Sequence, residues 1–177
     1  MKQILPILTL TTLTAAAFAD ASAPAAAAPA GLSYNRVGLS YQTNQIAASH
    51  PYALSASAFI GGSNVLVSAS AELVKGDDQS SASLGYVFKG VVAGIDATVS
   101  ASSNDTYGIN LRRSLGEVLS GLEVAFGYSS ASGSAKNDSF TYELSYNVTK
   151  QYSVAYSIQD PQGSGSSANN VSIRYNF

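Results

Sequence analysis

The chain contains one histidine, His50, and no cysteine, so few of its side chains suit proton transfer or nucleophilic attack near neutral pH. His50 precedes Pro51 in a polar stretch, and Asp77 and Asp78 lie in the next long polar stretch. A histidine oriented by a carboxylate can activate a serine hydroxyl, which would make the protein a hydrolase. No spacing of Ser or Asp around His50 matches a nucleophile motif. A loop histidine without a catalytic role is the simpler interpretation, and we expect no enzyme.

Acidic side chains in the polar stretches are the second group of candidates, because carboxylate oxygens bind divalent cations. Asp77, Asp78, Asp105 and Asp160 are of this kind, but none belongs to an Asp-x-Asp loop. The lack of cysteine excludes thiolate metal sites and disulfides. We therefore expect no metal and no cofactor.

The third group consists of charged side chains in segments where apolar and polar residues alternate. Each of these charges occupies a polar position of its segment, together with Ser, Gly, Ala, Thr or Asn. A period of two places such residues on one face of an extended segment. If that face points into a barrel, the four cations and four anions can pair across its interior. A lumen filled by paired charges and a narrow water-filled pore both remain open. The predicted lumen network is Arg36, Glu72, Lys89, Asp96, Arg112, Glu123, Glu143 and Arg174.

The last seven residues show most clearly which element positions these charges. Val171, Ile173, Tyr175 and Phe177 alternate with polar residues, which predicts a strand with one apolar face. A strand that closes a barrel in lipid can end on Phe, because its apolar face meets acyl chains. We expect these four residues to form a C-terminal assembly signal.

The same alternation recurs along the chain after Gly31 and predicts ten strands of mostly nine to twelve residues, the length that crosses a bilayer when tilted. Tight turns and longer polar loops alternate between them, as in transmembrane barrels. The tight turns are expected at 61–63, 89–90, 115–119 and 149–150. The strands are expected at about 32–42, 52–60, 64–75, 80–89, 91–102, 105–115, 120–130, 138–149, 151–159 and 169–177.

Aromatic residues on the apolar face gather toward the strand ends, which predicts two aromatic girdles at membrane interfaces. Arg113 is the one charge on this face, and it lies beside a tight turn from which it can reach the headgroups. The girdle toward the polar loops is Tyr41, Tyr52, Tyr107, Tyr128 and Tyr142. The girdle toward the tight turns is Phe88, Tyr146, Tyr152, Tyr175 and Phe177.

The overall composition separates this barrel from the soluble β-sandwich that would also alternate. Charged residues make up 11% of the chain, against about 25% in a typical soluble domain. The polar face is rich in Ser and Gly, whereas a face exposed to water should be rich in Lys and Glu. The net charge of −2 without a basic block excludes nucleic acid as a partner.

The N-terminus predicts export. Lys2 precedes an apolar stretch, and Ala17-Phe18-Ala19 matches a signal-peptide cleavage site. The stretch is too short and too interrupted to be a transmembrane helix. We expect a signal peptide at 1–19, an Ala/Pro-rich periplasmic leader at 20–30 and a barrel at 31–177.

The segment Leu32-Ser33-Tyr34-Asn35-Arg36-Val37-Gly38-Leu39-Ser40-Tyr41 resembles the opening strand of a family of small proteobacterial outer-membrane β-barrels, whose mature chains start Leu-Ser-Tyr-Asn-Tyr-Val and then alternate to a Tyr. Arg36 stands where the family has an aromatic residue. The likeness is specific in this segment and extends only in layout over 32–177. It implies an exported outer-membrane barrel of about ten strands and carries no activity with it.

These patterns together predict an all-β, antiparallel up-and-down transmembrane barrel with ten strands, or with eight as the alternative. The expected role is structural or that of a narrow, porin-like pore. Two alternatives are a surface-loop adhesin or receptor and a rim hydrolase that uses His50. The expected partners are outer-membrane lipid, the barrel-assembly machinery through the C-terminal strand, and periplasmic chaperones, with the protein itself a monomer.

Overall fold

The computed structural model describes residues 32–44, 52–73, 79–132, 138–163 and 165–177. The predicted signal peptide and leader, His50, Asp77 and Asp78 lie outside these residues. The described residues form ten strands. They are β1 (Arg36–Gln42), β2 (Tyr52–Phe59), β3 (Val65–Leu73), β4 (Gln79–Val92), β5 (Ile95–Ser102), β6 (Thr106–Ser114), β7 (Leu122–Ala131), β8 (Asp138–Asn147), β9 (Tyr152–Gln162) and β10 (Ala168–Asn176).

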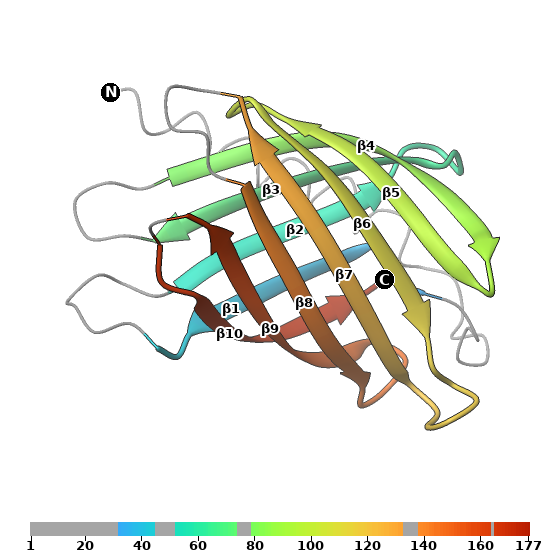
Figure 1. Cartoon of the computed structure of the whole chain (residues 1–177). Coiled ribbons are helices and arrows are strands. Elements are labelled where there is room, and N and C mark those ends of the chain that lie inside the picture. The colour runs from blue at the N-terminus through green and yellow to red at the C-terminus, as the bar shows by residue number, and fades with distance from the viewer. Residues whose placement is uncertain (1–31, 45–51, 74–78, 133–137, 164) are drawn as a thin grey trace.

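The strands form a closed barrel in which each pairs antiparallel with its neighbours in sequence (Figure 1). β10 closes the wall against β1, with Val37 opposite Tyr175 and Tyr41 opposite Val171. In Figure 1, β6–β8 run diagonally across the front of the barrel, and β1–β3 lie behind them and run in a different direction. The prediction of a ten-stranded up-and-down barrel is confirmed, and the eight-stranded alternative is wrong.

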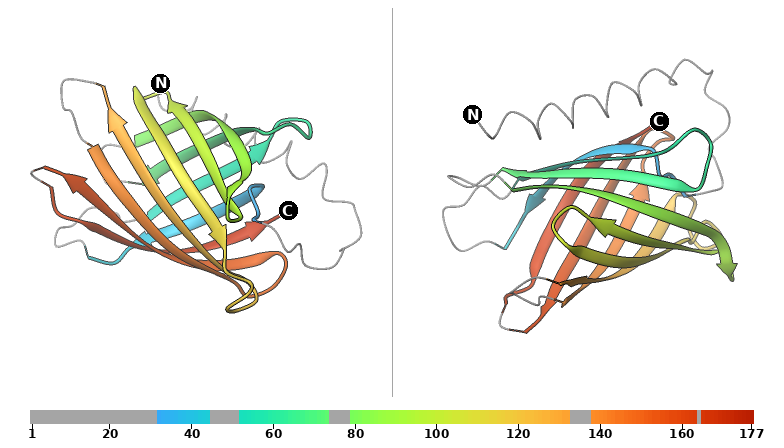
Figure 2. Two further views of the ribbon diagram at one scale, coloured as in Figure 1. Left: turned by 45° about the vertical axis from the view of Figure 1, so that its right-hand side comes forward. Right: turned by 90° about the horizontal axis from the view of Figure 1, so that it is seen from above.

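The connections between strands alternate between the two ends of the barrel. Those after β1, β3, β5, β7 and β9 lie at the end here called the long-loop end, although the β5–β6 connection (103–105) is shorter than the β6–β7 connection (115–121). The turns after β2, β4, β6 and β8 lie at the other end, here called the tight-turn end, and the start of β1 and the end of β10 lie there too. Figure 2 shows the same arrangement from two further directions. Among the described residues, no helix is long and apolar enough to cross a membrane.

Most predicted strand boundaries agree with the structure to within about three residues, but two predictions are wrong. The first strand begins at Arg36, so residues 32–35 lie outside the sheet. Lys89-Gly90 is not a tight turn, because β4 continues to Val92 and the chain reverses at Ala93-Gly94.

A β-bulge explains the misplaced turn. The pairing of β4 with β5 shifts between Phe88 and Val92, and Gly90 has a φ of 60° there. Asp96 accepts a hydrogen bond from the Gly90 backbone N–H at 2.8 Å, which holds the bulge. The reversal itself uses φ values of 50° at Ala93 and 74° at Gly94, as a two-residue hairpin turn requires. A Lys-Gly pair therefore marks a bulge here instead of a turn.

The side chains divide between the two faces with the period of the strands. Large apolar side chains are exposed on the outer face of all ten strands, as Leu39, Leu84, Ile109, Leu144 and Ile173 illustrate. The few fully buried apolar side chains include Val87, which is 0% exposed. Buried polar residues such as Arg112, Glu123 and Ser145 lie inside. The barrel thus has an apolar exterior and a polar interior.

Candidate functional site in the barrel lumen

The segment before β1 enters the barrel at its tight-turn end and places Tyr34 inside, where it is 5% exposed. The Tyr34 hydroxyl donates to Asp96 Oδ2 at 2.9 Å, and its ring centroid lies 5.0 Å from that of Phe59. Ser57 Oγ donates to the Tyr34 carbonyl at 2.7 Å. Burial raises the pKa of the Tyr34 hydroxyl, which keeps it protonated as a donor.

Arg112 on β6, the cross-strand partner of Asp96 on β5, holds the same segment. Its guanidinium lies 4.6 Å from the Tyr34 ring centroid, and its Nη1 donates to the Ser33 carbonyl at 2.9 Å. Its Nη2 pairs with Glu123 Oε2 at 2.8 Å, and Glu123 Oε1 accepts from Asn147 Nδ2 at 2.8 Å. We call Tyr34, Phe59, Asp96 and Arg112 the Tyr34 cluster. It connects the N-terminal segment to β2, β5 and β6 across the lumen.

A second ion pair crosses the interior between strands that are not neighbours. Arg174 on β10 donates through both terminal nitrogens to the two carboxylate oxygens of Glu143 on β8, with Nη1 2.7 Å from Oε1. The side chains are 12% and 15% exposed. Two parallel hydrogen bonds of this kind fix the relative orientation of the two side chains in addition to pairing their charges. Nearby, Asn176 Nδ2 donates to Ser153 Oγ at 3.4 Å. These two side chains are buried, as are Ser145 and Ser172, and together we call the four the packed polar core.

Arg36 lies near both ion pairs. The charges that act on its guanidinium are those of Arg112, Arg174, Glu143 and Glu123. Both glutamates are already held by the other arginines. Among the described residues, none forms a hydrogen bond or an ion pair with the Arg36 side chain. Arg36 instead lines a cavity.

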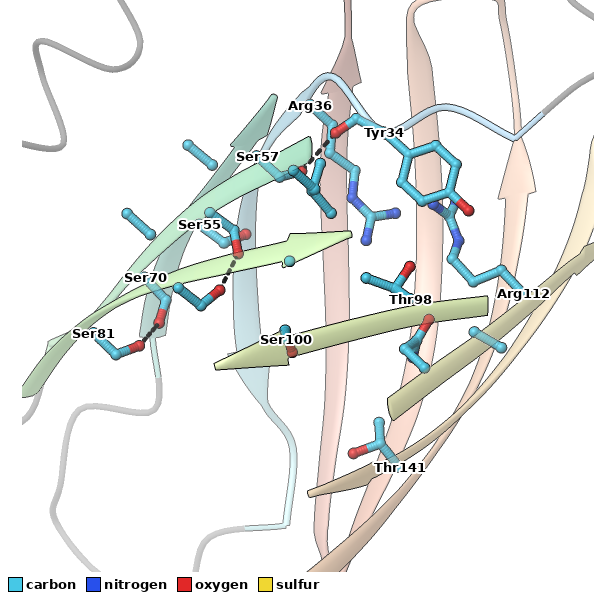
Figure 3. Close-up of a pocket in the computed structure, with 18 of the residues that line it drawn as sticks. Tyr34, Arg36, Ser55, Ser57, Ser70, Ser81, Thr98, Ser100, Arg112 and Thr141 are labelled. Atoms are coloured by element: carbon cyan, nitrogen blue, oxygen red, sulfur yellow. Dashed lines mark hydrogen bonds between the residues drawn. The ribbon is translucent and has the colours of Figure 1, made fainter. Parts of the chain in front are cut away.

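This cavity, here called the chamber, measures about 340 Å³ and lies against the β2–β5 wall (Figure 3). Figure 3 shows Tyr34, Arg36 and Arg112 at one end of it, with Ser70 and Ser81 at the other. Hydroxyl and amide side chains line most of its wall: Ser55, Ser57, Ser68, Ser70, Ser81, Ser83, Thr98, Ser100, Asn110 and Thr141. Two serine pairs are bonded to each other, Ser68 with Ser83 at 2.6 Å and Ser70 with Ser81 at 2.9 Å.

The eight residues of the predicted lumen network fall into separate places. The structure brings together Arg36, Arg112, Glu123, Glu143 and Arg174. Asp96 joins them through the Tyr34 hydroxyl. Two members lie apart from this group. Glu72 is exposed at the long-loop end of β3, and Lys89 is exposed with its Nζ 4.8 Å from the Phe59 ring centroid.

Tyr34 and Phe59 were not predicted as site residues, although the sequence holds a signal for both. In an alternating segment, residues two positions apart lie on the same face. Tyr34 therefore shares a face with Arg36, and Phe59 shares a face with Ser57. An aromatic ring on the otherwise polar face of an alternating segment indicates a side chain that fills the lumen. Asn147, which holds Glu123, carries no comparable signal.

The predicted girdle and terminal residues lie mainly on the outer face. Tyr41 and Tyr52 face each other near the long-loop end with ring centroids 5.2 Å apart. Tyr152 and Tyr175 do so near the tight-turn end at 5.4 Å. The exposed girdle residues also include Phe88, Tyr107, Tyr142 and Tyr146, whereas Tyr128 is half-buried.

In β10, Val171 and Ile173 are exposed, and Phe177 N–H donates to the Asn35 carbonyl at 3.1 Å. Arg113 pairs with Glu117 at 2.7 Å on the surface.

The pairing of the strands defines the class of this protein, which is the closed, ten-stranded antiparallel β-barrel. No protein-family model matches the chain, and the search of curated proteins finds no match. The resemblance of residues 32–41 to an outer-membrane family therefore stays a prediction.

The solved structures that are similar to the chain include the following three. The KdgM porin in complex with disordered oligogalacturonate aligns with a TM-score of 0.48 and 14% identity over 81% of this chain and 99% of its own. The Acinetobacter baumannii outer membrane protein Omp33 gives 0.40 and 10% over 83% and 100%. The Yersinia pestis outer membrane protein Ail, whose backbone structure was determined in a phospholipid bilayer nanodisc, gives 0.37 and 9% over 82% and 100%. The fold rests on the strand pairing of this chain and not on these alignments.

Proposed function

We propose that this chain is an integral outer-membrane β-barrel with a structural or narrow-pore role and no catalytic activity. The exposed apolar belt supports membrane insertion, since it runs over all ten strands. A soluble monomer rarely exposes a continuous apolar patch larger than a few hundred Å². A closed barrel has no free edges and satisfies its own backbone hydrogen bonds, as a segment in hydrocarbon must.

The observation that supports a closed or very narrow lumen is the Tyr34 cluster. Tyr34 is held at once by Asp96, Arg112 and Phe59, so a buried ring stands in the lumen at the tight-turn end. The chamber beyond it offers a polar path, while the cluster and the packed polar core obstruct the exit. The proposed barrel is therefore closed or barely conducting at rest.

A bilayer recording tests this function. The refolded chain should insert into planar bilayers and show no resolved conductance steps, or very small ones. Tyr34→Ala removes the ring and should produce larger steps, while Tyr34→Phe keeps the ring and should not. Large, stable steps from the unchanged protein would overturn the closed lumen. A chain that stays folded and monomeric in buffer without detergent would overturn the membrane location.

Three partners belong to the same proposal. Outer-membrane lipid would cover the apolar belt. The barrel-assembly machinery would recognise β10 through Val171, Ile173, Tyr175 and Phe177, whose strand closes the wall against β1. Periplasmic chaperones would hold the apolar strands before insertion, and the barrel would work as a monomer.

A further inference from the structure

Arg36 has a place in the lumen but lacks a partner among the described residues. The interior around it holds three guanidinium groups, on Arg36, Arg112 and Arg174, and two carboxylates, on Glu123 and Glu143. Each carboxylate is bound to one of the other two arginines. One positive charge in this group is therefore without a counter-charge in direct contact.

Asp96 does not supply that counter-charge. Its two carboxylate oxygens accept hydrogen bonds from the Tyr34 hydroxyl and the Gly90 N–H. Among the ion pairs of the described residues, none joins Asp96 to Arg36. Holding a guanidinium out of bulk water without a partner is unfavourable unless water or an anion occupies its donors. The Arg36 side chain lines the chamber, where such a partner would fit.

The size of the chamber suits a small solute. Its volume of about 340 Å³ lies at the lower end of the range typical of small-molecule sites, roughly 300–1,000 Å³. Its wall contributes hydroxyl groups from several strands. Ser55, Ser100 and Thr141 line it and form no side-chain hydrogen bond to another described residue. They are free to donate to or accept from hydroxyl groups of a ligand.

We propose that the chamber is a binding site for a small hydroxylated oxyanion, with Arg36 as the residue that holds the carboxylate or phosphate group. The planar guanidinium offers two parallel N–H donors that match either anion. The serine and threonine wall opposite Arg36 binds the ligand's hydroxyl groups. Few apolar side chains line the chamber, so it selects for a polar solute.

Direct titration tests the site without requiring conduction, so its outcome is separate from that of the proposed pore. The refolded protein in detergent micelles is titrated with D-gluconate, with inorganic phosphate and with D-glucose. Gluconate and glucose share a six-carbon polyol and differ in the carboxylate. We expect gluconate to bind at least tenfold more tightly than glucose, and more tightly than phosphate. Equal binding of gluconate and glucose would overturn the role of charge, and binding of phosphate alone would overturn the role of the hydroxyl wall.

Two variants assign the binding to Arg36. Arg36→Gln should weaken gluconate binding at least tenfold. The matched control is Arg113→Gln, which removes one positive charge from the exposed Arg113–Glu117 pair and should leave binding unchanged. Ser100→Leu fills the chamber without altering charge and should weaken binding of gluconate as well. If Arg36→Gln and Ser100→Leu both fold and bind gluconate like the unchanged protein, the proposal is wrong.

A measurement on the unchanged protein covers the case in which a variant fails to fold. Backbone amide resonances of Arg36, Ser57 and Ser100 should shift as gluconate is added, and those of the surface turn at 115–121 should not. Shifts confined to the surface, or no binding of any oxyanion, would overturn the site.

Discussion

The guanidinium of Arg112 lies 4.6 Å from the centroid of the Tyr34 ring, and it simultaneously pairs with Glu123 at 2.8 Å. One side chain on β6 therefore holds both the N-terminal segment and the neighbouring strand β7. A cation on a ring face and a buried ion pair each contribute more when water is excluded. This arrangement makes the interior of the tight-turn end a single connected unit.

The Tyr34 hydroxyl is the first target for a stability measurement. Tyr34→Phe keeps the ring against Phe59 and Arg112 but removes the hydrogen bond to the Asp96 carboxylate. Hydrogen bonds to charged groups contribute about 1.5–3 kcal/mol, so the free energy of unfolding should fall by about that amount. Urea titration of the protein folded into lipid vesicles measures it. The control is Tyr107→Phe, since Tyr107 is 58% exposed. Removal of its hydroxyl should lower the free energy of unfolding by less than about 0.5 kcal/mol. Equal effects of the two changes would show that the Asp96 contact contributes nothing.

The Arg174–Glu143 pair is suited to a double-mutant cycle. Arg174→Gln, Glu143→Gln and the double variant are compared by the free energy of unfolding. The two-point geometry and low exposure predict a coupling energy of about 1–3 kcal/mol. The exposed Arg113–Glu117 pair gives a matched cycle, in which the coupling should stay below about 1 kcal/mol. Similar couplings for both pairs would contradict the view that lumen burial strengthens the first.

Gly121 should be intolerant of any side chain, whereas Gly116 in the same turn should not. Gly121 has a φ of 85°, and a Cβ there would lie 2.9 Å from the Asn147 carbonyl oxygen. Gly121→Ala should therefore lower the free energy of unfolding by about 1–3 kcal/mol. At Gly116 the nearest atom to a Cβ is Ser114 Oγ at 3.5 Å, so Gly116→Ala should be close to neutral. The same vesicle titration distinguishes them, and a neutral Gly121→Ala would mean that the β6–β7 turn is differently shaped.

The strand pattern could be predicted from the sequence because one physical constraint acts on every strand. An apolar exterior and a polar interior impose a period of two, which shows in the sequence of each strand. Lys89-Gly90 was misplaced because a glycine with positive φ serves a bulge as well as a turn, and a single Lys-Gly pair fits both. Here the deciding contact is that of Asp96 with Gly90, which the sequence does not reveal.

The interior was less predictable, since parity tells which side chains point inward but not which of them meet. Arg174 and Glu143 lie on β10 and β8, with β9 between them, and their contact depends on the stagger of the barrel. Tyr34 precedes the first strand, and no local pattern states that the chain enters the lumen there. Arg36 was correctly grouped with the inward charges, but its lack of a partner depends on the positions of the other charged side chains.

The outer face allows a test of the solvent that surrounds the barrel. Leu84 lies on the outer face of β4 and is 56% exposed. In a bilayer, Leu84→Arg should cost about 2–4 kcal/mol, because a charge near the midplane faces hydrocarbon. On a sheet surrounded by water the same change should stay within about 0.5 kcal/mol. Val118→Arg is the control, since Val118 is 75% exposed in the turn between β6 and β7 and should cost about 1 kcal/mol or less. If both variants unfold at the same urea concentration as the unchanged protein in vesicles, the apolar belt does not lie in the membrane.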